Sequence, residues 1–270
     1  MLILLPPSET KTRPAEVGHR PLALDELALP ALTEARETML RAAHRTAAGP
    51  DAASRLGVPA SAPELVGRML HLEQEPAGAP LEVYSGVLFD QLDPGAAPSE
   101  DRRVLVQSAL LGLVDAARDR IPAYRLSAGS QLSRLGKAGS WWAPRLRPVA
   151  EELREEESAG PSPFVIDCRS GAYRSMMPLR SGEGVRVLEV SPVQERSGVR
   201  KVISHDAKRG RGLVTRALLA ARSAPATAEE LVDVVREGLA GHGRGDDGRS
   251  TGGLGVELDG DRLVVVERVG

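Results

Sequence analysis

The sequence predicts a single compact α+β domain, in which a mixed β-sheet is flanked by helices. The 270 residues can bury a substantial core, and 41% hydrophobic with 27% charged residues is ordinary for a globular protein. Helical and strand-like patterns alternate irregularly, without a repeat or a convincing linker, so we treat 1–270 as one domain. Two apolar runs flank Asp259-Gly260, which predicts a C-terminal hairpin over 255–267. A mixed α/β domain is the alternative interpretation.

The first half of the chain alternates apolar runs with polar, proline-rich stretches. We expect a buried strand at 2–5 and a loop over 6–30, followed by helices over 33–48 and 62–74. Residues 81–89 have a strand-like composition but could also begin a helix. For 99–118 we expect a helix, because Ser99-Glu100-Asp101 is a good helix start and apolar residues follow at helical spacing. Residues 121–126 are expected to be extended.

The second half of the chain is richer in strand signals. After a helix over 141–154 and a loop over 155–163, we expect strands at 164–168, 185–190 and 199–204. Two more helices are expected over 207–222 and 226–240. The segment 241–253 is rich in Gly, Asp and Arg and is expected to be mobile.

The charge balance limits the kinds of ligand site. The formal net charge is −2, so any nucleic-acid site must be a local basic patch on a near-neutral protein. Arginine dominates the basic residues, and only four lysines occur, at Lys11, Lys137, Lys201 and Lys208. A lysine that persists in such a chain can mark a place that needs a compact ammonium, although accidental persistence on a solvated surface is the plainer explanation.

The remaining composition predicts neither a metal site nor a cofactor. The one cysteine, Cys168, allows no internal disulfide and is expected to pack inertly in the core. The five histidines lack metal-ligand spacing. The N-terminal apolar run is too short for a signal peptide, and no stretch is long enough for a membrane helix. We expect a cytoplasmic monomer without membrane contact.

Two clusters in the first half could bind an anion. The segment Pro7 to Thr12 places Ser8, Thr10 and Lys11 directly after the first strand, where a polar loop without function is the alternative. It is not a P-loop, because the glycines are missing. The second cluster is Tyr84-Ser85-Gly86 with Tyr124-Arg125, in which a tyrosine could stack on a base or, alternatively, lie buried with a satisfied hydroxyl.

Two further clusters lie in the second half. Asp167 to Tyr173 follows a buried strand, and ligands of open sheets bind at the carboxyl ends of strands. A structural aspartate would give the same pattern. The segment 204–212 contains His205 and three basic residues at the start of a predicted helix, Lys208, Arg209 and Arg211. A solvated basic turn is the alternative there.

The order of these clusters resembles the YaaA family of peroxide-stress proteins. The resemblance covers residues 1 to about 220, and its pieces in order are Pro7 to Lys11, Tyr84 to Asp93, Ser108 to Leu113, Ile121 to Leu126, Trp141-Trp142, Asp167 to Tyr173 and 204–212. Leu111 stands where the family usually has an aromatic residue, and Arg211 where many relatives have lysine. Residues 114–119 are also more acidic than a DNA-binding hairpin would be.

The resemblance implies a YaaA-like α+β domain with a positively charged cleft and a helix-hairpin-helix-like element, which we place at about 100–128. It also implies a role in peroxide stress, in which DNA binding and lowered free iron limit iron-dependent oxidative damage. The partner would be DNA, including distorted or single-stranded DNA. Direct iron binding is the weakest interpretation, because no cluster of ligands has suitable spacing.

Two functions therefore compete, a DNA-binding stress protein and an enzyme acting on a nucleotide or purine-like small anion in a pocket lined by Lys, Tyr, Asp and Arg. The candidates for catalysis are Lys11, Asp167, His205 and Lys208. The residues expected to bind nucleic acid or an anion are Ser8, Thr10, Lys11, Tyr84, Gly86, Tyr124, Arg125, Arg169, Ser170, Tyr173, Lys208, Arg209 and Arg211. We expect these clusters to converge in space.

Overall fold

The apolar run near the start of the chain forms β1 (Leu2–Leu5), a central strand of the main sheet. The computed structural model describes residues 1–93, 95–202, 206–242 and 252–269. Within them, eight strands form one sheet in the order β11-β12-β9-β8-β1-β3-β4, with β10 beside β9. All four residues of β1 are fully buried. Such continuous apolar runs are typical of strands covered on both faces.

The sheet is mixed, as the sequence predicts. β1 lies parallel to β3 (Arg103–Ser108) and to β8 (Phe164–Asp167), which in turn pairs in parallel with β9 (Arg186–Arg196). Antiparallel partners complete it: β4 (Gly112–Asp115) beside β3, and β10 (Val199–Val202) beside β9. The strand β12 (Arg262–Val269) runs parallel to β9 and forms a hairpin with β11 (Gly252–Asp259).

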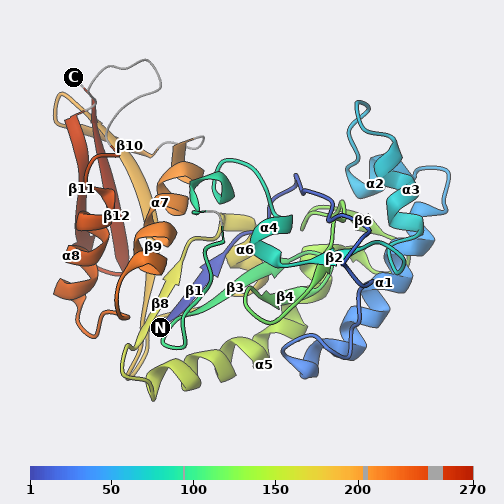
Figure 1. The fold of residues 1–270 in the computed structure, drawn as a ribbon, viewed down its shortest axis with the longest axis horizontal. Coiled ribbons are helices and arrows are strands. Elements are labelled where there is room, and N and C mark those ends of the chain that lie inside the picture. The colour runs from blue at the N-terminus through green and yellow to red at the C-terminus, as the bar shows by residue number, and fades with distance from the viewer. Residues whose placement is uncertain (94, 203–205, 243–251, 270) are drawn as a thin grey trace.

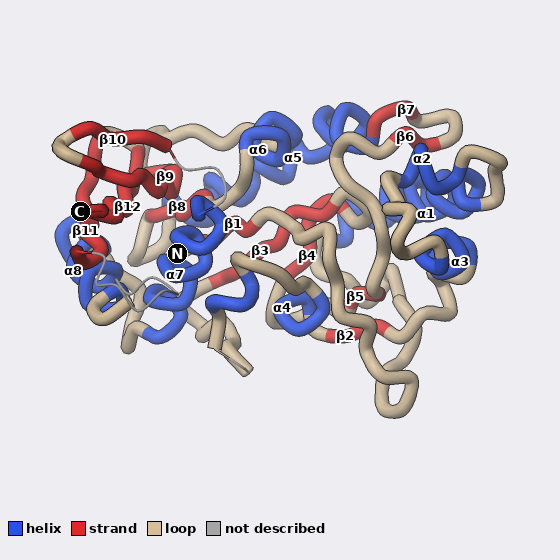
Figure 2. The backbone as a smooth tube through the Cα atoms, turned by 90° about the horizontal axis from the view of Figure 1, so that it is seen from above, coloured by secondary structure: helices blue, strands red, loops and turns tan. Residues whose placement is uncertain are grey.

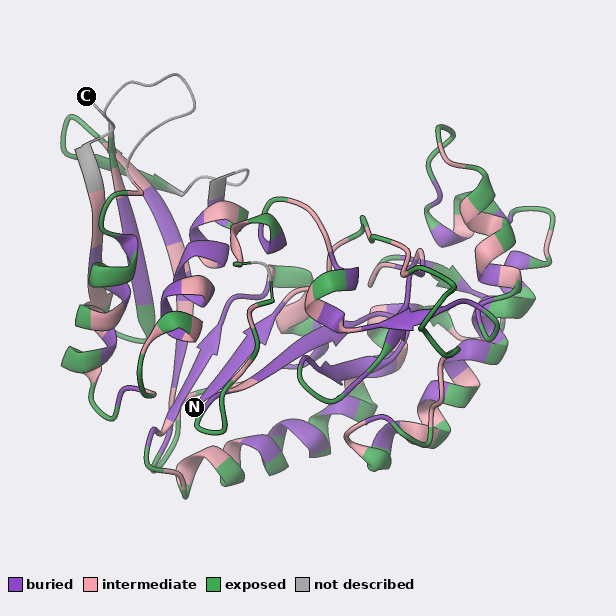
Figure 3. Ribbon diagram, viewed as in Figure 1, coloured by how far each residue is buried: buried purple, intermediate pink, exposed green. Residues whose placement is uncertain are grey.

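Helices cover both faces of this sheet (Figure 2). α5 (Ala138–Ser158) and α6 (Gly171–Met176) lie on one side, and α7 (Asp206–Ala220) lies on the other with α8 (Ala228–Leu239) beside it. Figure 3 shows the strands buried between these layers, whereas the outward faces of the helices are exposed. The expected single α+β domain with helices flanking a mixed sheet is confirmed.

A group of short elements extends beyond the β4 edge of the sheet (Figure 1). It contains α1 (Thr33–Ala47), α2 (Ala52–Leu56) and α3 (Glu64–Leu70). The buried Arg36 of α1 ties this group to the sheet, because its guanidinium donates hydrogen bonds to the carbonyls of Leu111 and Leu113. The smaller elements are η1 (Pro30–Leu32), α4 (Pro80–Val83), η2 (Phe89–Gln91), β2 (Ala77–Gly78), β5 (Ile121–Pro122), β6 (Gln131–Leu132) and β7 (Gly136–Lys137).

The helix predicted over 99–118 is wrong, since this range folds into β3 and β4. Val104, Leu105 and Val106 are fully buried and form a continuous apolar run, which also satisfies helical spacing. Gly112 has φ of +74°, which a right-handed helix does not allow. The same finding removes the helix-hairpin-helix-like element from 100–128: every residue of that range is described, and its regular elements are strands.

Other boundaries shift by a few residues. α3 is shorter than the helix predicted over 62–74, and α5 continues to Ser158 into the predicted loop. The segment 81–89 is neither a strand nor one helix, because it joins α4 to η2 by an extended turn. Most of the predicted mobile segment 241–253 lies outside the described residues, as does His205.

Candidate functional site

The carboxyl ends of three neighbouring parallel strands bring the predicted clusters to one edge of the sheet. β1, β3 and β8 run in the same direction, so the segments that follow Leu5, Ser108 and Asp167 leave the sheet at the same edge. In open sheets this edge is the usual place for ligands. The first and third clusters are therefore neighbours at this edge.

A short antiparallel bridge joins the first cluster to the second. The Thr12 amide donates to the carbonyl of Val83 over 2.8 Å, and the Ser85 amide donates to that of Thr10 over 3.3 Å. Lys11 and Tyr84 are directly opposite each other in this bridge. Side chains of opposed residues lie on the same face, which places the Lys11 side chain against the Tyr84 ring.

The Lys11 ammonium lies among aromatic rings and has no carboxylate contact among the described ion pairs. Its Nζ is 4.0 Å from the centroid of the Tyr124 ring and 5.1 Å from that of Tyr84. It donates a hydrogen bond of 2.6 Å to the carbonyl of Ser8. The residue is partly exposed, but its charged end is poorly solvated. Burial and then the nearby Arg125 charge lower the pKa of Lys11 to about 7.

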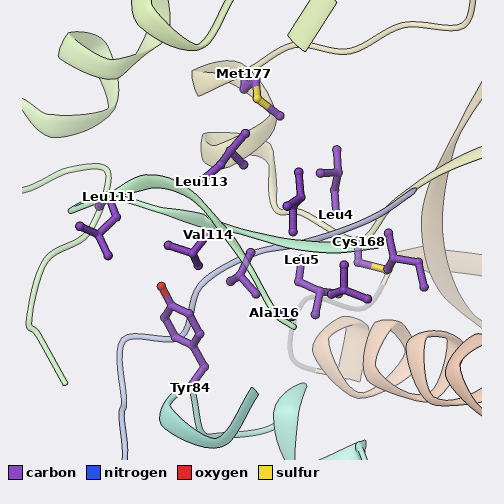
Figure 4. Packing of buried hydrophobic residues seen from close by; sticks show 14 of the residues in the cluster. Leu4, Leu5, Tyr84, Leu111, Leu113, Val114, Ala116, Cys168 and Met177 are labelled. Carbon is purple, nitrogen blue, oxygen red and sulfur yellow. The ribbon is translucent and has the colours of Figure 1, made fainter. Parts of the chain in front are cut away.

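The two tyrosines form a buried hydroxyl chain with Ser108. The hydroxyls of Tyr84 and Tyr124 are 2.8 Å apart, and that of Tyr124 is 2.8 Å from Ser108 Oγ. Ser108 Oγ also accepts the amides of Leu110 and Leu111. Figure 4 shows the Tyr84 ring in the packed interior near Val114. Because both rings are buried, the predicted stacking of Tyr84 or Tyr124 on an exposed base is not available in this structure.

Residues 7–12 form a loop after β1, which we call the Lys11 loop. Arg125 connects this loop to the turn between α2 and α3. Its Nε donates to the carbonyl of Gly57 over 2.8 Å, and another guanidinium nitrogen donates to the Glu9 carboxylate over 2.9 Å. The Arg125 side chain keeps 18% of its surface exposed, whereas that of Glu9 keeps 65%. The side chains of Arg125 and Glu9 are therefore both in contact with solvent.

Two hydroxyls and a glycine complete the Lys11 loop. Ser8 Oγ lies 3.1 Å from Thr10 Oγ1, and Thr10 donates to the carbonyl of Ser85 over 3.1 Å. Gly86 has φ of +99°, and a Cβ there would lie 3.0 Å from Thr10 Oγ1. A side chain at position 86 would therefore be strained and would crowd these hydroxyls.

Asp167 and Arg169 form a buried ion pair and do not face a ligand. The Arg169 guanidinium donates to both Asp167 oxygens, over 2.8 and 2.7 Å, and also to Gln107 Oε1 and the carbonyl of Met177. Arg169 is fully buried and Asp167 is 3% exposed. This pair stabilises the end of β8, so the structure supports neither Asp167 as acid or base nor Arg169 as a phosphate ligand.

The rest of the third cluster lies nearer to the surface. Ser170 is partly exposed at the start of α6, and Tyr173 accepts the amide of Ala128 at its hydroxyl over 3.2 Å. Burial raises the pKa of the Tyr173 hydroxyl. The thiol of Cys168 is fully buried and its pKa is raised to about 12, so the expected inert packing is confirmed.

The described part of the fourth cluster, residues 206–212, lies in the first turns of α7. α7 packs on η2 so closely that a Cβ at Gly212 would overlap the carbonyl of Leu88. Lys208 is exposed, Arg209 donates to the carbonyl of His242, and Arg211 donates to that of Val190. The described contacts bring α7 to residues 88–91 but do not join Lys208 to Lys11. The convergence of the fourth cluster with the others thus remains a prediction.

A hollow of about 600 Å³ adjoins Tyr84 but has the wrong charge for an anion. Its polar lining includes Glu82, Asp90 and Asp93 against a single cation, Arg120. The edge of the sheet around Lys11 has two cations, Lys11 and Arg125, and one carboxylate, Glu9. It is therefore the better anion site. Among the described residues, no group of three or more His, Cys, Asp or Glu side chains could hold a metal ion.

Three contributors to the site escaped sequence reasoning: Glu9, Gly57 and Ser108. Glu9 is in the first cluster, but its ion pair with Arg125 spans 116 residues and has no local signal. Ser108 was missed because the sequence predicted a helix over 99–118, whereas this residue ends strand β3. A strand prediction there would have placed it at a carboxyl end, beside the other clusters.

Sequence comparisons agree with the order of the motifs. A UPF0246 protein of Streptomyces coelicolor is 37% identical over 246 residues, covering 88% of this chain and 90% of the relative. One from Corynebacterium efficiens is 37% identical over 239 residues, covering 87% and 92%. A UPF0246 protein of Francisella tularensis is 29% identical over 162 residues, 60% of each chain.

The described part of the chain has no helix that combines the length and the apolar character needed to cross a membrane. Residues 1–242 match the family described as "Peroxide stress protein YaaA". With this match and the high coverage of the relatives, the chain belongs to the YaaA peroxide-stress family.

Proposed function

We propose that this protein acts in the peroxide-stress response by binding DNA at the edge of the sheet formed around Lys11 and Arg125. The observation that carries the proposal is the position of Arg125, which joins the Lys11 loop to the α2–α3 turn. Two cations next to a helix pair give a surface that can grip a phosphate backbone without reading its sequence.

We assign the helix-hairpin-helix-like element to α2 and α3 instead of 100–128. The two helices are joined by residues 57–63, and Gly57 ends α2 in the left-handed conformation with φ of +76°. Ala60 and Ser61 are exposed at the tip of this turn. The main-chain amides of Ala60 and Ser61 can donate to phosphate oxygens while Arg125 supplies charge beside the turn.

A binding mode of this kind agrees with the near-neutral chain. The cationic groups would be local: Lys11 and Arg125 on one side, and Lys208 with Arg209 at the start of α7 on the other. DNA held there during peroxide stress would be shielded from iron-dependent oxidative damage. Such backbone binding also suits distorted or single-stranded DNA, because phosphate contacts do not require a regular duplex.

The test is binding of fluorescent duplex, bubbled and single-stranded DNA at several salt concentrations. We expect micromolar or tighter binding by the wild type that weakens steeply with salt, because each neutralised phosphate releases counterions. Lys11→Ala, Arg125→Ala and Lys208→Ala should each weaken binding and reduce the salt slope by about one. Lys201→Ala, at an exposed lysine of β10, is the matched control and should bind like wild type.

Absent binding, or binding indifferent to both Lys11→Ala and Arg125→Ala, would exclude DNA as the ligand of this edge. Thermal unfolding of each variant separates lost contacts from lost folding. Nucleotides and purines would then be screened for thermal stabilisation of the protein.

The alternative, an enzyme acting on a nucleotide-like small anion, is favoured by the enclosure of Lys11 Nζ between the rings of Tyr84 and Tyr124. A lysine with a pKa of about 7 is partly neutral at physiological pH, as catalytic lysines are. Backbone binding alone needs only a charged lysine.

A further inference from the structure

Lys11 makes no ion pair with Glu9, although Glu9 lies only two residues away in the chain. The nearest acidic side chain in sequence is Glu9, and the guanidinium of Arg125 takes its carboxylate at 2.9 Å. Among the described residues, Lys11 Nζ donates its one hydrogen bond to the Ser8 carbonyl, and the faces of two tyrosine rings lie beside it. A lysine that served only to attract phosphate would need neither the aromatic enclosure nor the removal of its counter-ion.

We infer that Lys11 is an amine nucleophile that forms an imine with an aldehyde on damaged DNA, the open-chain sugar of an abasic site. The inference rests on the proposed DNA function and names the substrate of the same edge. Arg125, whose side chain is 18% exposed, would hold a phosphate beside the damaged sugar. Lys11 is the catalytic residue, and Arg125 is a positioning residue.

The protonation state of Lys11 suits this reaction. Only the neutral amine carries a lone pair for attack, and an ordinary lysine is almost entirely protonated at neutral pH. With a pKa of about 7, about half of the Lys11 amines are neutral at that pH. Enclosure by aromatic rings and an adjacent cation are two known ways of activating a lysine.

The reaction is balanced without an oxidant, a metal or a further catalyst. The Nζ lone pair attacks the aldehyde carbon, and the carbonyl electron pair moves to oxygen. Proton transfer from nitrogen to oxygen gives a carbinolamine, which loses water and leaves a carbon–nitrogen double bond. The products are thus the imine and one water molecule.

The surroundings favour an aldehyde over an ester or a phosphate as the electrophile. Hydrolysis of those groups would need a positioned base or metal, and the one described carboxylate among the candidates, Asp167, is locked in its pair with Arg169. No three-ligand metal cluster is present among the described residues either. Imine formation needs only a neutral amine, and peroxide-derived radicals produce abasic sugars in DNA.

The test is reductive trapping on a fluorescent duplex that contains one abasic site. The wild-type protein is incubated with this duplex and sodium cyanoborohydride, which reduces an imine to a stable secondary amine. We expect a covalent protein–DNA product, with the adduct at Lys11 by peptide mass spectrometry. An intact duplex of the same sequence should give none.

Variants separate chemistry from binding. Lys11→Arg retains the positive charge and should keep most of the DNA affinity, but its cross-link should fall at least tenfold. Lys201→Ala should cross-link like wild type. Salt-dependent binding to the same duplex is measured in parallel, and thermal unfolding shows whether Lys11→Arg is folded.

Wild-type protein that binds the duplex but gives no adduct at Lys11 would overturn the imine and leave the DNA function standing. A cross-link of full yield in folded Lys11→Arg would also overturn it. Absent binding together with absent cross-linking would overturn both proposals.

Discussion

At the scale of single residues, the reactivity of Lys11 depends on two neighbours of opposite charge. Arg125 lowers the pKa of Lys11 by repulsion, and Glu9 raises it by attraction. Arg125 also holds the Glu9 carboxylate, which limits what Glu9 can offer to Lys11. Burial is the largest cause of the lowered pKa of Lys11, and the opposing charges of Arg125 and Glu9 adjust that pKa further.

Arg125→Gln should therefore raise the pKa of Lys11 from about 7 towards its ordinary value of 10.5. The substitution removes the repulsion and releases Glu9, while desolvation remains and keeps the pKa below 10.5. The measurement is the pH dependence of Lys11 acetylation by a small anhydride, followed by mass spectrometry. Its midpoint should move to higher pH, so the yield at pH 7 should fall.

Arg222→Gln, at an exposed arginine beyond the end of α7, is the control and should leave the midpoint unchanged. An unchanged midpoint in folded Arg125→Gln would show that Arg125 does not tune Lys11.

The sequence could predict which residues were candidates for this site, but not which of them are buried in ion pairs. The scarcity of lysine and the position of Lys11 after a buried strand identified it as a candidate. Asp167 and Arg169 had the same polar, strand-end signature, yet they pair with each other in the interior. Burial decides between these outcomes, and burial depends on contacts with Gln107 and Met177 that no local pattern reveals.

At the scale of elements, the β3–β4 hairpin shows where pattern reasoning failed. Strands buried on both faces have apolar residues at every position, so any period fits them, including the helical one. Gly112 was the useful signal. A glycine within a predicted helix argues against that helix, and Gly112 begins β4 with a positive φ and lies under the ring of Trp142.

Gly112→Ala should lower the free energy of unfolding by about 2–5 kcal/mol. A Cβ at this position would lie 2.9 Å from the Trp142 ring, and overpacking of this kind costs about 1–3 kcal/mol. The left-handed backbone adds about 1–2 kcal/mol for any residue with a Cβ. Urea unfolding of wild type and variant gives the difference.

Gly67→Ala is the matched control, because Gly67 lies inside α3 with open space around its Cβ position. It should stabilise the protein by about 0.5–1 kcal/mol. Equal stability of Gly112→Ala and wild type would mean that Trp142 moves aside without cost.

At the scale of the whole molecule, the C-terminal hairpin completes the sheet. β12 pairs with β9 along residues 262–269, and the side chains of Leu263 and Val265 are buried. The family match ends at residue 242, before this hairpin begins. The fold class and most strands could be predicted from local patterns, but this parallel pairing across about 70 residues could not.

A chain that ends after His242 should therefore be markedly less stable than the full chain. Loss of the β11–β12 hairpin would uncover one edge of β9 and the face of α8 that packs on β11. The unpaired edge of β9 could then pair with other copies of the chain. We expect a lower thermal midpoint and concentration-dependent aggregation, measured by circular dichroism and light scattering. A truncated protein with the full-length midpoint would show that the sheet is complete without the hairpin.

The central position of β1 also has a consequence for how the protein is made. Leu2 pairs with Arg103 on one side and with Val165 on the other, so β1 has no sheet partner until about 100 further residues have been translated. At roughly 5–20 residues per second, this wait is about 5–20 s. During that time Leu2–Leu5 leaves the ribosome as an unpaired apolar segment. Until β3 has been made, the Leu2–Leu5 segment is therefore open to binding by a chaperone.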